Sequence, residues 1–559
     1  MRMASIQTTA GGMPVLILKE GTKESKGKEA QKNNITAAKL IAEIVKTSLG
    51  PRGMDKMLVD TLGDVTITND GAIILKEIDV QHPAAKMMVE VAKSVDNEVG
   101  DGTTSVVVLA GALIEKAEEL INKDVHPSVI VDGYNAAAEQ ALKLLEKIAV
   151  KVDIADKDML LKITRTSMDS KLVSDDSPVL AQIVVDATKQ VAEKADGIYK
   201  VDLDDIKVEK KAGGSMRDTK LIKGIVLDKE VVHSGMPKRV EGAKIALINS
   251  ALEIEKTEMS AEIRISEPQQ MQMFLEEENR MLKSMVDKIK SSGANVVLCQ
   301  KGIDDIAQHY FARANVLAVR RVKESDMTKM ARATGARIVN NLDDLTAKDL
   351  GSADLVEERK VETDKWVFVE GCKNPKAVSI LIRGGSQRVV DEADRSMHDA
   401  LMVMKDVLEH PAIVAGGGAP EAYIANELRQ WSSSQEGRAQ LAVQKFADAL
   451  DAIPLNLAEN AGMDPIDTMT ELRASQSKGS KWTGVDCRNT KVAEMYKQNV
   501  LEPLVIKQQI IKSGTEVAAM ILRIDDVIAS GKSKMPAGPP GGGMGGMGGM
   551  GGMGGMDME

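Results

Sequence analysis

The sequence predicts a multidomain α+β protein in which two mainly helical ends flank an α/β centre. Helical periodicity dominates the first 150 residues and returns over residues 405–530. Between about 225 and 385, short runs rich in β-branched residues, such as NVVLCQ and VSILIRGG, alternate with helical stretches. At 559 residues the chain is long enough for roughly three or four domains. This pattern favours a central insertion into one helical domain.

The helical ends carry recognisable start and stop signals. In NNITAAKLIAEIVKTSLGP the apolar residues fall on one helical face, Asn33 or Asn34 is expected to cap the start, and Gly-Pro ends the helix. A hairpin is predicted next, with strands MLV and VTIT joined by a turn over 60–64. Further helices are expected over 84–97 and 103–122, in RAQLAVQKFADALDAI, and in the stretch ending MILRIDDVIAS.

One segment of the centre is polar and poor in strand signals, EIEKTEMSAEIRISEPQQ, and a helix with an apolar stripe follows it. The stripe contains Met271, Phe274 or Leu275, Met281, Leu282, Met285 and Ile289. Ser266 to Gln269 fits a capping box at the start of this helix. From the residues alone, the favoured interpretation of the stripe is an amphipathic helix packed on its own domain. The alternative is a projecting arm whose Met-rich side meets a partner.

Composition excludes several classes of function. The net charge of -10 and the 2% aromatic content disfavour nucleic-acid binding, which needs clustered positive charge and stacking rings. The cysteines, Cys299, Cys372 and Cys487, are too few and too far apart for a disulfide framework or a zinc site, as expected in a reducing cytosol. No signal peptide or membrane-spanning run is present. The sequence therefore predicts a soluble, cytoplasmic protein, with residues 536–559 as a flexible Gly/Met tail.

Residues 99–105, VGDGTTS, carry the strongest indication of chemistry. They precede a predicted helix, and a helix N-terminus with free N–H groups binds phosphate. Gly100 and Gly102 allow the backbone to approach an anion closely. Asp101 would repel a phosphate unless a cation lies between them, which suggests a Mg²⁺ ligand. On the motif alone, a glycine turn with a capping aspartate is an equally good explanation.

Other loops extend this hypothesis. SLGPRGMDKM supplies a tight loop at a helix end, ITNDG places Asp70 after a predicted strand, and IVAGGGAPE places glycines 416–418 before a helix. A P-loop is excluded, because the Gly531-Lys532-Ser533 run has Asp526 where its first glycine should stand.

These motifs occur together with MHDAL, FADALDAIPLNLAENAGMDPID and MILRIDDVIAS, in order, from about residue 13 to 535. In this respect the sequence resembles a group II chaperonin subunit, the archaeal thermosome type related to the eukaryotic cytosolic chaperonin. The resemblance implies three domains: an equatorial ATP-binding domain (1–152 and 409–535), an intermediate hinge domain (153–222 and 377–408), and an apical domain (223–376) whose protrusion, about 254–290, forms a built-in lid.

The resemblance also implies an activity and partners. The chain is expected to be an ATPase that uses ATP and Mg²⁺, to capture non-native proteins, and to enclose them for folding without a separate lid protein. Identical or paralogous subunits would form a back-to-back double ring, commonly of eight subunits per ring. A small-molecule enzyme or a passive holdase ring on the same scaffold is the alternative.

The resemblance assigns roles residue by residue. Asp70 and Asp399 would position and activate the attacking water, and Asp101 would hold Mg²⁺. Asp399 would lie in the intermediate domain, so that hydrolysis would await domain closure. The implied nucleotide contacts are Leu49, Gly50, Pro51, Gly102, Thr103, Thr104, Ser105, Lys171, Gly417 and Asp486.

The sequence departs from the family at one place. Before the EP of LEPL, members usually have a glycine, with an acidic residue two positions earlier near the ribose. Here Asn499 and Lys497 occupy those positions. The expectation for the phosphate end of the site is unaffected, whereas the contacts at the nucleoside end are open.

Overall fold

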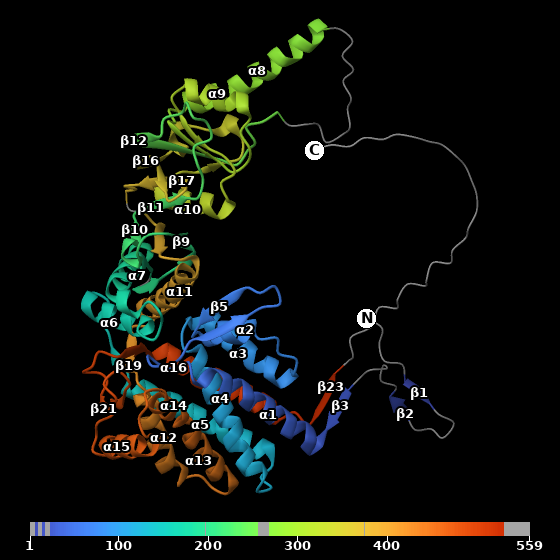
Figure 1. The fold of residues 1–559 in the computed structure, drawn as a ribbon, viewed down its shortest axis with the longest axis vertical. Coiled ribbons are helices and arrows are strands. Elements are labelled where there is room, and N and C mark those ends of the chain that lie inside the picture. The colour runs from blue at the N-terminus through green and yellow to red at the C-terminus, as the bar shows by residue number, and fades with distance from the viewer. Residues whose placement is uncertain are drawn as a thin grey trace, which may run out of the picture. The chain divides into compact units, whose positions relative to one another are not determined.

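The computed structural model describes residues 6–8, 14–16 and 23–529 apart from 196, 255–267 and 374 (Figure 1). Two compact units are present: Asn33–Arg523, and a small unit made from the two chain ends, Met1–Lys32 and Ile524–Glu559. In the small unit, β1 (Ile6–Thr8) pairs with β2 (Pro14–Leu16), and β3 (Lys23–Lys26) pairs with β23 (Asp526–Ala529), both antiparallel. The predicted tail lies outside the described residues.

Two predictions about helix ends were wrong. Helix α1 runs over Gly27–Lys46, so Asn33 and Asn34 lie within it and neither caps it. The apolar period begins late, but the preceding KEAQK consists of strong helix formers. At the other end, α16 (Leu504–Leu522) stops before IDDVIAS, where β23 forms because its backbone groups pair with β3.

Helices from both halves of the chain share one hydrophobic core in the large unit. Helices α4 (Thr103–Ile121) and α5 (Pro127–Ile148) pack against α13 (Arg438–Leu450) and α16. The Tyr134 ring meets Phe446 edge-on, with centroids 5.6 Å apart. Among the other helices that contribute to this core are α1, α2 (Gly71–Glu77), α3 (Pro83–Val99), α12 (Ala419–Ser432), α14 (Ala452–Asn460) and α15 (Pro465–Ser477).

Small sheets connect distant parts of this helical region. Strand β19 (Ala412–Ala415) pairs antiparallel with both β6 (Val150–Lys151) and β22 (Leu501–Pro503). Strands β20 (Thr483–Asp486) and β21 (Lys491–Glu494) form a further hairpin. The first of these sheets brings residues 150–151 beside residues 412–415 and 501–503, which are far away in the sequence.

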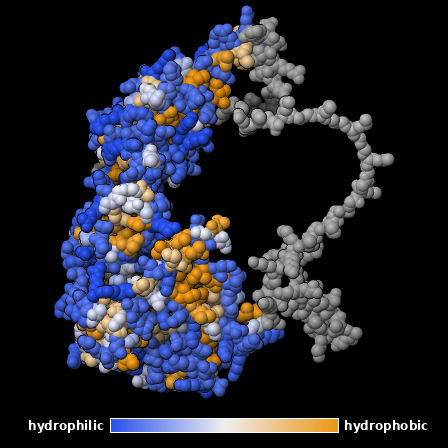
Figure 2. Space-filling view, in the orientation of Figure 1, coloured by the Kyte–Doolittle hydropathy of each residue, from blue (hydrophilic) through white to orange (hydrophobic). Residues whose placement is uncertain are grey.

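The predicted hairpin at 57–68 is confirmed as β4 (Lys56–Val59) and β5 (Val65–Thr68). Its apolar side chains are not buried: Met57 is 66% exposed, Val59 63% and Leu62 87%. Figure 2 shows apolar surface where Figure 1 places β5, α2 and α3. An apolar area of this kind on a folded chain marks a contact surface.

A small α/β region lies next along the chain. Helices α6 (Lys157–Met168) and α7 (Ser177–Val191) pack on α11 (Gln387–Glu409), beside a sheet in the order β10 (Lys220–Ile222), β18 (Val378–Gly384), β9 (Ile206–Ala212). Strands β7 (Glu193–Ala195) and β8 (Ile198–Lys200) form a hairpin. Strand β9, IKVEKKA, was not predicted, because lysine and glutamate are uncommon in strands. Its parallel pairing with β18 holds it extended.

The predicted α/β centre has its own core around a seven-stranded sheet. The strands are β11 (Gly224–Leu227), β17 (Asp364–Glu370), β16 (Gly351–Val361), β12 (Arg239–Ile248), β13 (Val296–Cys299) and β14 (Leu317–Val319) in spatial order, with β15 (Ile338–Val339) paired to β12. Helices α9 (Asp305–Arg313) and α10 (Glu324–Thr334) cover it. The mixed, multi-core architecture confirms the predicted multidomain α+β class. No described helix is long and apolar enough to cross a membrane.

The striped helix is α8 (Pro268–Ser291), and its stripe divides into two parts. Leu282 and Ile289 are buried in the core of the α/β centre, whereas Met271, Phe274 and Leu275 are 53%, 44% and 52% exposed. Figure 1 shows the N-terminal part of α8 extending beyond α9. The helix therefore packs on its own domain at one end and presents an unpartnered apolar surface at the other. Residues 255–267, including Ser266 and Glu267 of the predicted capping box, lie outside the described residues.

Candidate nucleotide site

Two adjoining cavities in the large unit collect the site residues that the sequence predicts. The smaller, of about 80 Å³, is lined by Asp70, Thr103, Thr104, Lys171 and Asp399. The larger, of about 350 Å³, is lined by Pro51, Gly417 and Asp486. Both cavities are bordered by the remaining predicted residues: Leu49, Gly50, Asp101, Gly102 and Ser105. Segments from seven parts of the chain therefore meet at one place.

The N-terminus of α4 borders both cavities and is not capped by a side chain. Gly102 occupies the N-cap position and supplies no side-chain acceptor. The N–H groups of the first helical turn are consequently available, and the helix dipole adds partial positive charge. This is the geometry in which helices bind phosphate groups.

Gly102 is required here by both conformation and space. Its φ of +81° lies in the left-handed region that side chains disfavour. A Cβ at this position would lie 2.7 Å from Cδ1 of Ile510 on α16. A side chain at this position would therefore strain the backbone of the turn between α3 and α4 and would require Ile510 to move.

Asp70 caps α2 and contacts α4. Its two carboxylate oxygens accept hydrogen bonds from the backbone N–H groups of Ala72, at 3.2 Å, and Ile73, at 3.3 Å. The Thr103 hydroxyl donates to Asp70 Oδ1 at 2.8 Å. The carboxylate is thus fixed beside the N-terminus of α4 by contacts that also cap α2.

Lys171 and Asp399 form a buried ion pair at the inner end of the smaller cavity, between the loop after α6 and α11. Their side chains are only 9% and 11% exposed. Burial raises the pKa of Asp399 well above its ordinary value, and Asp70 and Asp101 raise it further, while Lys171 opposes them. Burial lowers the pKa of Lys171, but the three carboxylates outweigh it and hold this pKa above the ordinary value.

The charges of the smaller cavity are unbalanced in a way that suits a divalent cation. Asp70, Asp101 and Asp399 bring three carboxylates to one place, and Lys171 is the cation that faces them among the lining residues. Burial is the main cause of the raised pKa of Asp399, and repulsion from Asp70 and Asp101 adds to it. Hard oxygen ligands beside a phosphate-binding helix end are the donors that Mg²⁺ takes.

The larger cavity continues away from the α4 N-terminus toward β20, β21 and β22. Gly417 lies at its wall with a φ of +66°, and the carbonyl of Val485 is close to it. Asp486 is 5% exposed, and its carboxylate accepts hydrogen bonds from the backbone N–H of Asn489, at 3.1 Å, and from its side-chain amide, at 2.8 Å. Asp486 therefore shapes the turn between β20 and β21 in addition to lining the cavity.

The two departures from the family differ in consequence. Asn499 lines the larger cavity and has a φ of +58°, which explains the family preference for glycine and why asparagine substitutes for it. Lys497 is 75% exposed, pairs with Glu494, and is absent from the cavity lining. Asn499 is thus the departure that alters the wall of the site.

Sequence reasoning missed Glu502 on this wall. Its carboxylate lines the larger cavity and lies 2.7 Å from the Lys507 ammonium, which is 2.8 Å from buried Glu421. Burial raises the pKa of Glu502, and Lys507 opposes that shift. The LEPL motif could have indicated Glu502, because it places an acidic residue at the end of a strand. The contact of Lys507 with Glu421 could not be predicted, because it depends on packing between α12 and α16.

Comparison with known proteins identifies the family to which the chain belongs. Residues 41–532 match the TCP-1/cpn60 chaperonin family. The chain belongs to that family. It is 58% identical to thermosome subunit alpha of Archaeoglobus fulgidus over 97% of this chain and 99% of that protein. It is 58% identical to thermosome subunit beta of Thermococcus kodakarensis (93% and 95%) and 57% identical to a thermosome subunit of Pyrococcus horikoshii (95% and 97%). The predicted resemblance is confirmed, and the function is that of an ATP-dependent chaperone.

The substitution Gly102→Ala tests the tight turn before α4. We expect a loss of about 1–2 kcal/mol in the free energy of unfolding from the left-handed backbone, and a further loss because Ile510 must move. Gly462→Ala is the matched control, since its φ is +74° but no atom lies within 4 Å of the added Cβ. Calorimetry and titration with nucleotide should show weaker binding for Gly102→Ala alone; equal behaviour of both variants would contradict the assignment.

Proposed function

We propose that this chain binds ATP in the two cavities, hydrolyses it, and uses the associated movement to enclose and fold non-native proteins. The observation that carries the proposal is the position of Asp399. This carboxylate belongs to α11 but reaches the cavity formed by the α4 N-terminus, where it meets Lys171. A carboxylate supplied by another part of the chain makes hydrolysis dependent on how those parts are arranged.

The triphosphate would lie in the smaller cavity and at its border with the larger one. The N–H groups at the start of α4, the hydroxyls of Thr103, Thr104 and Ser105, and the loop at Leu49–Pro51 surround that space. The nucleoside would occupy the larger cavity. There the Glu502 carboxylate is an acceptor for sugar hydroxyl groups, and Gly417 leaves room for the ring system.

Asp101 would hold Mg²⁺, with Asp70 nearby to complete its surroundings through water. When bound, the ion supplies positive charge that offsets the carboxylates and the phosphates. In the described part of the chain, no three Asp, Glu, His or Cys side chains lie close enough together to hold a metal ion by themselves, and this includes Asp70, Asp101 and Asp399. Phosphate oxygens are therefore needed to complete the coordination, which ties the ion to the nucleotide.

Asp399 would orient the attacking water and accept its proton. The raised pKa of Asp399 makes it a stronger base than an exposed aspartate, and the Lys171 ammonium favours the ionised form that this role requires. Asp70 would position the same water. Phosphoryl transfer depends mainly on such positioning and on electrostatic stabilisation.

We further propose that the shared helical core corresponds to the equatorial domain, the region of α6, α7 and α11 to the intermediate domain, and the α/β centre to the apical domain. Separate hydrophobic cores support independent movement of the centre. The exposed stripe on α8 would take part in the lid. The exposed apolar hairpin β4–β5 would be covered by identical or paralogous subunits in a double ring, commonly of eight per ring.

Asp399→Asn tests the catalytic assignment. We expect ATP hydrolysis to fall about 100- to 10,000-fold, because a general base is lost, while ATP affinity changes little. In the unchanged protein, the rate should fall at acidic pH around a pKa above the ordinary aspartate value of about 3.9, since protonation removes the base. Phosphate release is measured without any acceptor molecule, which distinguishes hydrolysis from a kinase reaction.

Asp394→Asn provides the control for that experiment. Asp394 lies on α11 but pairs with Lys210, at 3.0 Å, away from both cavities. Its hydrolysis rate should match that of the unchanged protein. Full activity of Asp399→Asn would show that Asp399 is not the general base. Absence of hydrolysis in the unchanged protein would overturn the proposed ATPase activity.

Charge introduced on the β4–β5 hairpin tests assembly. Val59→Asp should shift the protein from its ring to smaller species, because the apolar contact surface would then bury an unpaired carboxylate. Ile198→Asp, at an equally exposed position (63%) in β8, serves as the control. Light scattering after size-exclusion chromatography gives the mass of each species; an intact ring for Val59→Asp would exclude the hairpin as a contact.

A further inference from the structure

An ion pair lies where the lining of the larger cavity meets solvent. Arg488 Nη2 lies 3.0 Å from Asp169 Oδ2, and both residues line the cavity. Their side chains are 54% and 25% exposed, so the pair lies at the boundary between cavity and solvent. Asp169 follows α6, whereas Arg488 lies in the turn between β20 and β21. Two walls that are far apart in the sequence are therefore joined.

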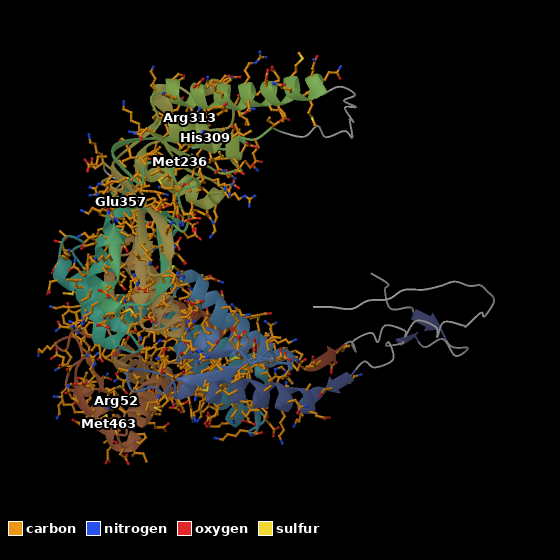
Figure 3. The ribbon with its side chains drawn as sticks, turned by 45° about the horizontal axis from the view of Figure 1, so that its top comes forward. Arg52, Met236, His309, Arg313, Glu357 and Met463 are labelled. Carbon is orange, nitrogen blue, oxygen red and sulfur yellow. The ribbon has the colours of Figure 1, made fainter. Side chains whose placement is uncertain are left out.

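A third segment of the cavity wall, the loop before Arg52, is linked to Arg488 by a hydrogen bond. Arg52 Nη2 donates a hydrogen bond to the backbone carbonyl of Arg488 at 3.3 Å. Arg52 follows the loop at Gly50 and Pro51, which lines the cavity from the opposite end of the chain. In Figure 3, Arg52 lies beside the orange-brown ribbon of the C-terminal part of the chain. Segments 49–53, 169–171 and 487–490 are thus linked around the opening.

Both partners of the ion pair are held in place from behind. Asp169 accepts a hydrogen bond from the Ser177 hydroxyl on its other oxygen, at 3.1 Å, and the next carbonyl, that of Ser170, accepts from the Asn69 amide. The turn that carries Arg488 is braced by the contacts between Asp486 and Asn489. Because both sides are preorganised, the pair forms with little additional ordering.

The same short loop carries the catalytic partner. Lys171 is two residues from Asp169 and pairs with Asp399. We infer that Arg488 and Asp169 form a latch over the proposed nucleotide site, which must open for nucleotide to enter or leave. The inference rests on the proposed function of this site. A partly exposed ion pair is weak and is screened by salt, so the latch slows exchange without preventing it.

A direct contact of Arg488 with the nucleotide would have a different signature. A latch hinders the movement of nucleotide into and out of the cavity. Its removal therefore accelerates binding and release by similar factors and leaves the dissociation constant unchanged. A guanidinium that binds phosphate would contribute affinity instead. In that case, removal of Asp169 would free Arg488 and would not accelerate release.

The experiment is stopped-flow fluorescence with a fluorescent ADP analogue and Mg²⁺ on the full-length assembled protein. Asp169→Asn and Arg488→Gln should each raise both rate constants about two- to fivefold, the effect that a partly exposed ion pair supports. The double variant should be no faster than either single variant, since one interaction is lost in all three. Added salt should accelerate the unchanged protein more than the variants.

Arg217→Ala is the matched control. Arg217 pairs with Asp176 at 3.2 Å with similar exposure, 77% and 27%, close to the same loop, but neither residue lines the cavity. Its exchange rates should equal those of the unchanged protein. Unchanged rates in Asp169→Asn would overturn the latch, as would faster release confined to Arg488→Gln with weaker affinity. Failure of the unchanged protein to bind the analogue would instead overturn the proposed nucleotide site.

Discussion

The buried ion pair between Lys171 and Asp399 is the constraint on which the rest of the site depends. Either charge alone would be costly in this surrounding, and breaking such a pair typically costs about 3–5 kcal/mol. The loop after α6 and helix α11 are therefore held to the same cavity that the α4 N-terminus forms. Asp70 and Asp101 add negative charge that the single Lys171 ammonium, already paired with Asp399, does not neutralise. The cavity is therefore suited to a cation that is bound together with an anionic ligand.

The remaining features follow from how the helical core is assembled. Helices of the first 150 residues pack on helices beyond residue 405, and this packing places Gly50, Gly102 and Gly417 around one space. Tight contacts to Leu457 and Ile510 exclude a side chain at the first two positions. Much of the proposed nucleotide site thus follows from core packing between the chain ends, and the α/β centre, which has a separate core, contributes none of its described residues to the lining of either cavity.

Sequence patterns predicted much of this fold because they are local. The β4–β5 hairpin, helices α3 and α4, and the buried strands β13 and β18 follow their periodicity closely. Strands β9 and β16 were missed because charged residues occupy them, and their partners rather than their composition hold them extended. The glycine loops and Asp70 were visible as motifs. The Glu421–Lys507–Glu502 cluster and the Arg488–Asp169 pair were not, because each joins residues that only tertiary packing brings together.

We propose that hydrolysis at Asp399 drives the folding of other proteins. The decisive experiment measures the activity recovered by an unrelated, chemically denatured enzyme after mixing with the assembled protein, with Mg²⁺ and ATP or without nucleotide. Activity should be recovered only with ATP, and not when every subunit carries Asp399→Asn. Recovery without nucleotide, or equal recovery with the variant, would contradict this proposal, because folding would then proceed independently of the chemistry at this site.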